Sequence, residues 1–433
     1  PRQRVRFLLL AVALSAIVVL AGCGSSSSSS SSTTASSGGG GESTTASEPQ
    51  GTPIKIGVVY TSGSPIQNSV NVYAADKAAI QALNEAGGLN GQPVELVACD
   101  DKGDPNQTES CGRKLVSEEV AAVAGGILIN GATLNPILAA AKIPQIGIVP
   151  YTPVEFNAKN VFLFNGGGFF GSEALAAYLG QQKLTTSLVT AQGAAAEGFK
   201  AAMEGSIAAA GGKFTNIVPV SATQSDWAPI VAAATSNNAN SVMDLVDTEQ
   251  TKQLLAANEQ AGAPIEHIFT VSNFTTEDSA EIGGEGALER IVTGGSYPPF
   301  DSKVPAMEEF TEQMTAEFEA GETEARIGRQ DLGSFGGWLA VKALETLAEQ
   351  GELAKEVTAA TVTKALDSAK NVELGGATPP WTPSAPGPEG FARVANEKTY
   401  LIGFKGGEQF LIAPQPLTVE EIIAGKAPAP PGS

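Results

Sequence analysis

Residues 54–101 have the sequence IKIGVVYTSGSPIQNSVNVYAADKAAIQALNEAGGLNGQPVELVACDD. The run Ile54–Tyr60 is apolar and rich in β-branched residues, which predicts a buried strand. Apolar residues then recur at helical spacing from Val72 to Leu83, which predicts a helix. Gly87 can end this helix, because glycine adopts the left-handed conformation of a helix cap without strain.

A second apolar run, Val94–Cys99, predicts the next strand. Strand, helix and strand in so short a stretch indicate a βαβ unit, which is typical of a parallel sheet covered by helices. Ligands of such sheets bind at the carboxyl ends of the strands. The loop 61–68 and the equivalent loops further along the chain are therefore the first candidates for a binding site.

The same alternation continues along the chain and begins a second series after residue 165. Two βα series in 433 residues predict an α/β protein of two doubly wound, parallel-sheet lobes. The further strands are expected at residues 120–124, 143–149, 161–165, 187–190, 214–218, 241–246, 268–271 and 291–293. Residues 400–404 and 409–412 flank Lys405-Gly406-Gly407 and predict a β-hairpin.

The N-terminus predicts export and membrane anchoring. Arg2, Arg4 and Arg6 precede an apolar run of signal-peptide length, and residues 20–23 read LAGC. This resembles the bacterial lipobox, in which the cysteine, here Cys23, is lipidated and becomes the new N-terminus. Residues 24–52 are almost all Ser, Thr, Ala and Gly, too polar to fold, so they predict a disordered tether.

Composition excludes several classes of function. The net charge is −20, and such an acidic surface repels nucleic acids. His267 is the single histidine, so neither a metal site nor a catalytic triad is expected. Residues 166–171 formally match G-x-G-x-x-G, but the acidic residue that a dinucleotide site needs is missing at 190–192. We expect no enzyme activity and no cofactor.

Two cysteines, Cys99 and Cys111, remain after Cys23. Since the predicted compartment is oxidising, we expect a disulfide between them, with two free thiols as the alternative.

Beyond these patterns, the sequence resembles the leucine/isoleucine/valine-binding family, which has the type I periplasmic binding protein fold and serves ABC importers. The resemblance rests on IKIGVVYTSGS (54–64), AIQALNEAGGLNGQPVEL (79–96), EGFKAAMEGSIAAAGG (197–212), QLLAANEQAG (253–262) and FGGWLAVKALETLAE (335–349). It implies two lobes joined by a three-segment hinge, with a small-molecule ligand between them. It further implies a monomer that delivers its ligand to ABC permease subunits at the outer face of the cell membrane.

The resemblance also implies domain boundaries. Lobe 1 would combine residues 53–165 and 301–373, and lobe 2 would combine 166–300 and 374–413. Residues 1–23 would be the signal peptide, and the Pro/Ala-rich tail 414–433 is expected to be flexible.

The ligand site is expected in the loops that follow the strands. The family binds an amino-acid carboxylate in the loops after strands three and four, which here contain Asn130-Gly131 and Tyr151-Thr152. The family's acidic residue for the ammonium group falls at Asn273, which carries no charge, and Asp247 could substitute for it. The predicted ligand-binding residues are Asn68, Asn130, Gly131, Tyr151, Thr152, Asp247, Thr248 and Asn273. These side chains suit a neutral or amide-bearing solute.

Two alternatives stay open. A receptor module of the same fold could present its ligand to a sensor instead of a permease. An ordinary amino-acid site could also lie a few residues away, with Thr152, Thr248 or Glu249 as its polar groups.

The lipobox predicts that Cys23 anchors the protein. In a Cys23→Ala variant the acceptor thiol is missing, so we expect the protein to appear unprocessed or in the soluble fraction. Cell fractionation and immunoblotting measure this. A variant that stays membrane-bound and processed like the wild type would show that Cys23 is not the anchor.

Overall fold

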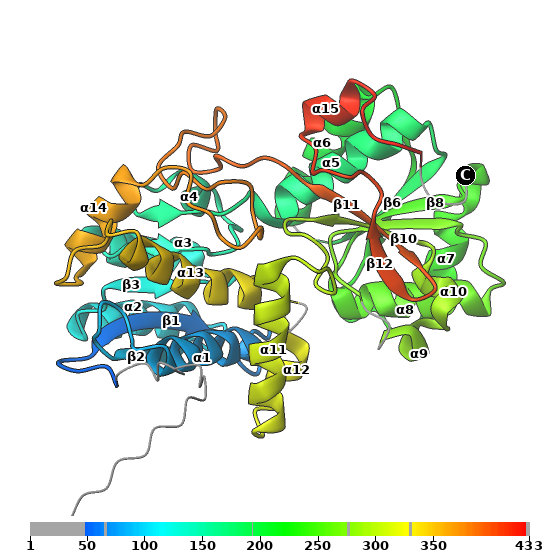
Figure 1. Ribbon diagram of the computed structural model, residues 1–433. Coiled ribbons are helices and arrows are strands. Elements are labelled where there is room, and N and C mark those ends of the chain that lie inside the picture. Colours follow the sequence, from blue (N-terminus) through cyan, green and yellow to red (C-terminus); the bar gives the residue numbers. More distant parts are fainter. Residues whose placement is uncertain (1–47, 65–66, 193, 275–277, 329–330, 430–433) are drawn as a thin grey trace, which may run out of the picture. The chain divides into compact units, whose positions relative to one another are not determined.

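The computed structural model describes residues 48–64, 67–192, 194–274, 278–328 and 331–429. Their strands form two sheets, and we call the parts built on them lobe 1 and lobe 2 (Figure 1). None of the described helices is long and apolar enough to cross a membrane. The predicted signal peptide, Cys23 and most of the predicted tether lie outside the described residues.

Lobe 1 contains a parallel sheet with the strand order β2-β1-β3-β4-β5. The strands are β1 (Ile54–Tyr60), β2 (Val94–Asp100), β3 (Ala122–Ala124), β4 (Gln145–Ile146) and β5 (Val161–Phe162). The strand predicted at 54–60 is present with those bounds. The strand predicted at 143–149 is reduced to two residues, because the backbone turns at Gly147, whose φ is +70°.

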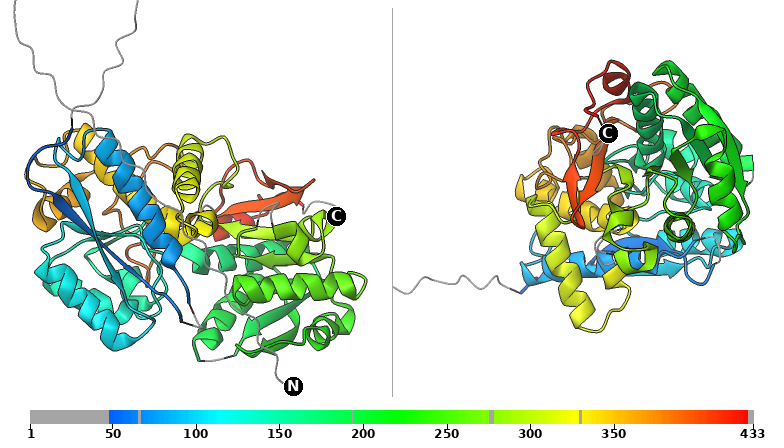
Figure 2. Two further views of the ribbon diagram at one scale, coloured as in Figure 1. Left: turned by 90° about the horizontal axis from the view of Figure 1, so that it is seen from below. Right: turned by 90° about the vertical axis from the view of Figure 1, so that its right-hand side faces the viewer.

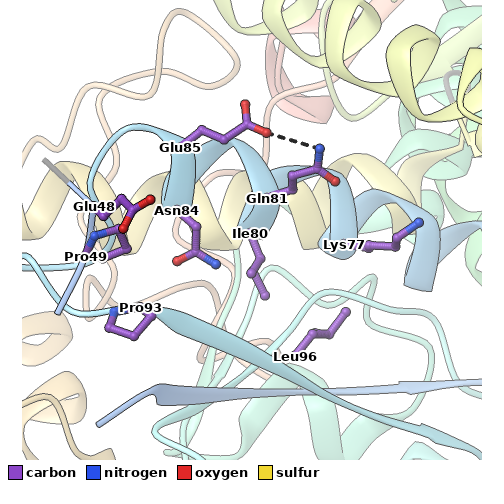
Figure 3. A pocket seen from close by; sticks show the side chains of 9 residues that line it. All are labelled: Glu48, Pro49, Lys77, Ile80, Gln81, Asn84, Glu85, Pro93 and Leu96. Carbon is purple, nitrogen blue, oxygen red and sulfur yellow. Dashed lines mark hydrogen bonds between the residues drawn. The ribbon is translucent and has the colours of Figure 1, made fainter. Parts of the chain in front are cut away.

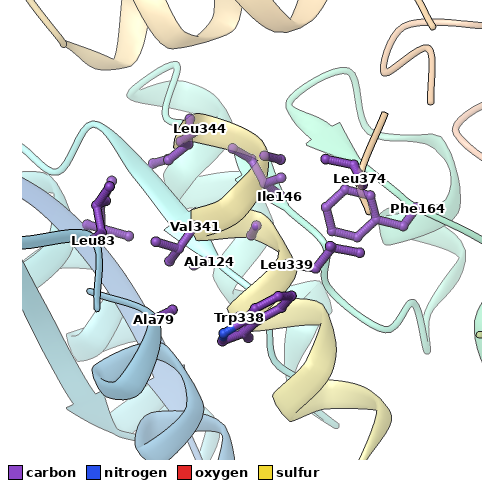
Figure 4. Packing of buried hydrophobic residues seen from close by; sticks show 14 of the residues in the cluster. Ala79, Leu83, Ala124, Ile146, Phe164, Trp338, Leu339, Val341, Leu344 and Leu374 are labelled. Carbon is purple, nitrogen blue, oxygen red and sulfur yellow. The ribbon is translucent and has the colours of Figure 1, made fainter. Parts of the chain in front are cut away.

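Helices from two distant parts of the chain cover this sheet. They are α1 (Val70–Glu85), α2 (Pro105–Ser117), α3 (Gly131–Ala140) and α4 (Pro153–Asn157), followed after lobe 2 by α11 (Pro305–Glu319), α12 (Ala325–Gly328), α13 (Leu332–Glu349) and α14 (Ala359–Ser368). α1 and α13 lie side by side (Figure 2). Trp338 and Leu344 of α13 share one buried core with Leu83 of α1, Ala124 of β3 and Ile146 of β4 (Figure 4).

Lobe 2 contains a mixed sheet with the order β12-β11-β10-β9-β8-β6-β7. The strands are β6 (Thr186–Ala191), β7 (Phe214–Val220), β8 (Ser241–Leu245), β9 (His267–Thr270), β10 (Ile291–Gly295), β11 (Tyr400–Lys405) and β12 (Glu408–Leu411). β6 to β10 are parallel, and β11 and β12 form the antiparallel hairpin expected around residue 406. The covering helices are α5 (Gly167–Gln182), α6 (Ala194–Ala209), α7 (Ala228–Ala234), α8 (Thr248–Gln260), α9 (Ser279–Ile282), α10 (Glu285–Leu288) and α15 (Val419–Ile423).

The structure differs from the expected boundaries at the end of the chain. Residues 374–395 were expected in lobe 2, but Trp381 is 3% exposed in the core of lobe 1 and its Nε1 donates to the carbonyl of Leu163 at 2.8 Å. Arg393 likewise donates through Nε to the carbonyl of Val161. The burial of a tryptophan and the half-buried guanidinium hold this Pro/Gly-rich segment on lobe 1.

The expected flexible tail is also partly wrong. Residues 414–429 fold onto lobe 2, where Ile422 of α15 is fully buried and Tyr178 Oη donates to the carbonyl of Pro428 at 2.8 Å. At the other end, Gln50 of the predicted tether donates its N–H to the carbonyl of Gly91 at 2.8 Å, so the ordered part begins before residue 53.

Cys99 at the end of β2 and Cys111 in α2 are joined by a disulfide, with their Cα atoms 5.5 Å apart. Both lie among the apolar residues between the sheet and α2. That the native protein is oxidised at this pair stays a prediction, which depends on the compartment.

Close backbone contacts join α13 to the turns that follow β3 and β4. A Cβ on Gly125 would lie 2.1 Å from the Cα of Gly337, and one on Gly336 would lie 2.3 Å from the carbonyl oxygen of Gly147. Gly125 and Gly147 also have positive φ angles of +51° and +70°. Only glycine allows so close an approach. These contacts fix the points from which two of the candidate ligand loops leave the sheet.

An alanine at position 336 should therefore strain the fold. We expect Gly336→Ala to lower the free energy of unfolding by about 2 kcal/mol, because its Cβ must displace the backbone of residue 147. Denaturation with urea, followed by circular dichroism, measures this. Gly205→Ala in α6 is the matched control. Apart from its own helix backbone, no described atom lies within 4 Å of a Cβ there, so the free energy of unfolding should rise by up to about 1 kcal/mol. Equal effects of the two substitutions would contradict the close contact.

Candidate functional site

The loop after β1 is fastened to the end of β2 by two aspartates. Thr61 donates its hydroxyl to Asp101 at 2.7 Å, and Ser62 donates both its N–H and its hydroxyl to Asp100. Lys102 pairs with the same Asp100 carboxylate, and these bonds lower the pKa of Asp100 although partial burial opposes the shift. Asn68, at the end of this loop, is exposed to solvent.

Gln67 connects this loop to the loop after β3. Its side-chain amide donates to the carbonyl of Ile127, and its Oε1 accepts from the N–H of Ile129 at 3.1 Å. Asn130 follows directly and is the N-cap of α3, but its side chain makes no capping hydrogen bond. Asn68 and Asn130 are thus presented by two loops that one glutamine joins.

A buried carboxylate organises the loop after β4. Glu155 is 3% exposed, and its Oε2 accepts from the N–H groups of Tyr151 and Thr152, both at 2.8 Å. Burial raises the pKa of Glu155, and the two amide bonds partly oppose this shift. The carboxylate therefore holds the backbone of two predicted ligand residues in one conformation.

Gly131 packs directly against the same carboxylate. A Cβ at this position would lie 1.9 Å from Glu155 Oε1, so any larger residue would force the carboxylate out of place. Gly131, Tyr151 and Thr152 are thus brought together around Glu155. Sequence reasoning missed Glu155, although Thr152-Pro153-Val154-Glu155 matches the capping-box pattern S/T-x-x-E.

In lobe 2 the predicted residues lie at the ends of two neighbouring strands. Asp247 follows β8 and caps α8, with its carboxylate accepting from the N–H of Gln250 at 2.9 Å. The hydroxyl of Thr248 donates to Ser272, which follows β9, at 3.2 Å. Asn273 is the next residue and is half-buried. Asp247 and Thr248 are exposed, so the structure presents all three side chains at one edge of the sheet.

A second buried acid lies behind this edge. Asp244 of β8 is 1% exposed and accepts from the hydroxyl of Thr251 in α8 at 2.5 Å. Burial raises the pKa of Asp244 to about 7. The group that sequence reasoning chose, Asp247, is the exposed member of this acidic pair.

An open groove of about 580 Å³ lies elsewhere on the described surface (Figure 3). It runs between α1 and β2, next to Lys77, Gln81 and Asn84, and contains none of the predicted ligand residues. A much smaller cavity lies at the strand ends of lobe 1, where Glu155 and Gln145 are its polar lining residues. Among the described residues, no group of three or more His, Cys, Asp or Glu side chains could hold a metal ion.

Residues 53–395 match the sequence model of a family described as periplasmic binding protein. The chain belongs to the periplasmic binding protein family. Members of this family bind solutes, and the two-lobed α/β fold that the sequence predicts is confirmed by the family match and by the two sheets. Comparison with curated protein sequences gives no match.

Solved structures of several binding proteins share this fold. A fatty acid ABC transporter substrate-binding protein from Thermomonospora curvata is 18% identical with a TM-score of 0.66, over 89% of this chain and 97% of that one. A possible leucine/isoleucine/valine-binding protein from Rhodopirellula baltica SH 1 is 16% identical with a TM-score of 0.62, over 85% and 97%.

A third similar structure is a solute binding protein of an ABC transporter from Rhodopseudomonas palustris BisB5, in complex with 3,4-dihydroxy benzoic acid. It is 17% identical with a TM-score of 0.64, over 88% of this chain and 99% of that one. At such low identities these likenesses establish the fold of this periplasmic binding protein, and its solute has to be sought in its own side chains.

The contact between Gly131 and Glu155 can be tested by a double-mutant cycle. In this periplasmic binding protein Gly131→Ala should cost about 2 kcal/mol of unfolding free energy, because its Cβ collides with the carboxylate. In a Glu155→Ala background the same substitution should cost at least about 1 kcal/mol less. Chemical denaturation of the four proteins measures this coupling. Strictly additive costs would show that the two loops are not held together by Glu155.

Proposed function

We propose that this protein is the membrane-anchored, extracellular substrate-binding component of an ABC importer. The family match over residues 53–395 carries this proposal, since periplasmic binding proteins capture solutes. The lipobox at Cys23 and the Ser-rich segment that follows support an anchored protein held close to its membrane partner. Export places the protein at the outer face of the cell membrane.

The solute in this proposal is a small polar molecule, amino-acid-like or amide-like, held between the two lobes. The supporting observation is the chemistry of the strand ends. Asn68, Asn130 and Asn273 offer neutral donors and acceptors there, together with Thr152 and Thr248. Glu155 is enclosed and already accepts two amide N–H groups, which makes it a positioning residue for the loop. The net charge of −20 disfavours a strongly anionic solute.

A thermal-shift screen over amino acids, small amides, urea and small aromatic acids tests this function. A true ligand at 100 times its Kd should stabilise the protein by about 2.7 kcal/mol. Asn130→Ala and Asn273→Ala should each weaken its binding by about tenfold, the effect of losing one hydrogen bond. Asn106→Ala, at an exposed position on α2, is the control and should bind like the wild type.

Binding of leucine, isoleucine or valine that depends on Glu249 but on neither Asn130 nor Asn273 would contradict the assigned site. A receptor that serves a sensor is the second candidate for the anchored protein. The genes beside this one distinguish the two: permease and ATPase genes favour import, and a histidine kinase gene favours sensing.

A further inference from the structure

Six aromatic rings form one connected cluster at the ends of β4, β5 and β6. Phe169 lies at its centre, with ring centroids 5.2 Å from Phe199, 5.4 Å from Phe391, 5.8 Å from Phe170 and 6.0 Å from Phe156. Tyr151 joins the cluster through Phe199, at 6.5 Å. We call these six residues the aromatic cluster.

The cluster has a buried base and an exposed rim. Phe156 and Phe170 are each 6% exposed and pack among Ile148, Val161 and Val394, so they form a fixed floor. The other four rings form the rim, in which Phe169, Phe199 and Phe391 are half-buried and Tyr151 is 44% exposed. A rim supported in this way keeps its ring faces in place at little cost in conformational entropy.

The rim is assembled from both lobes. Tyr151 belongs to the loop after β4 in lobe 1, and Phe199 belongs to α6, which follows β6 in lobe 2. Phe169 lies in the first turn of α5, directly after the chain leaves β5. Tyr151 is also the neighbour of Thr152 on the loop that Glu155 holds. The cluster is therefore continuous with the candidate ligand site.

The exposed area limits what can cover the rim. An aromatic side chain offers on the order of 200 Å², so one ring at 44% exposure and three half-buried rings leave at most roughly 300 Å². A specific protein partner buries about 800 Å² on each side. The rim is too small for a protein interface and has the size of one face of a small molecule.

We propose that the rim of the aromatic cluster binds an aromatic ring of the transported solute. This inference rests on the proposed function and narrows its solute to a small molecule that joins a planar ring to neutral polar groups. Tyr151 and Phe199 would contact the ring from the two lobes, and the asparagines at the strand ends would bind the polar groups. Aromatic rings favour offset-stacked or edge-to-face neighbours, so the rim would select a planar ring over a saturated one.

Matched pairs of compounds test this inference on the whole lipid-free chain. Calorimetry compares benzamide with cyclohexanecarboxamide, and N-acetylphenylalaninamide with N-acetylcyclohexylalaninamide. The aromatic member of each pair should bind about tenfold more tightly, as expected for two ring contacts. Tyr151→Leu and Phe199→Leu should each remove most of this preference, whereas Tyr151→Phe, which keeps the ring, should retain it. Phe318→Leu, at an exposed ring on α11, is the control and should change nothing.

The outcomes separate this inference from the proposed function. Binding of the saturated compounds as tightly as the aromatic ones, unchanged by Tyr151→Leu, would overturn the ring site and leave a solute-binding protein. No binding of any member of either pair, with no ligand in the wider screen, would overturn both. An aromatic preference that persists in both leucine variants would also overturn the ring site.

Discussion

The close backbone contact between α13 and the exits of β3 and β4 determines how lobe 1 is arranged. A Cβ on Gly125 would collide with the backbone of Gly337, and a Cβ on Gly336 or Gly147 would collide with the backbone of the other. The same helix turn places Trp338 in the core, so the contact and the burial of the tryptophan are coupled. The two loops that carry half of the candidate ligand residues leave the sheet at these glycines, and their geometry thus depends on a helix more than 180 residues away in the chain.

Two buried carboxylates near this contact, Glu155 and Asp76, differ in their hydrogen bonding. Glu155 accepts hydrogen bonds from two backbone N–H groups, so it orders the loop after β4 at a moderate cost in desolvation. Asp76 of α1, against Gly337, has no hydrogen-bond partner among the described residues, and burial raises its pKa well above the ordinary value. A raised pKa means that this group favours the folded state at low pH. Its contribution is lost as the pH rises through the pKa of the folded protein.

Much of the fold could be predicted from local patterns. β1 has the predicted bounds because its β-branched run is buried, and α2 begins where Asp104 accepts from the N–H groups of Asn106 and Gln107. Other features depend on contacts that no local pattern contains. The Pro/Gly composition of residues 374–395 is typical of a solvated loop, yet Trp381 is inserted into lobe 1. The ring of Phe391 contacts Phe156 and Phe169, which lie more than 200 residues earlier in the sequence. The aromatic cluster therefore could not be predicted from local sequence patterns.

The crossing of the chain between lobes also has a consequence for biogenesis. Lobe 1 is completed only by α11 to α14 and by Trp381, which follow the whole parallel part of the lobe 2 sheet in the sequence. In the export that we propose, the N-terminal strands emerge first, and α1 covers only part of the apolar face that α11 to α14 and Trp381 complete. Contacts at such long range form slowly, so the early strands are exposed to aggregation in the meantime. An exported chain with this connectivity has reason to depend on chaperones outside the cell membrane.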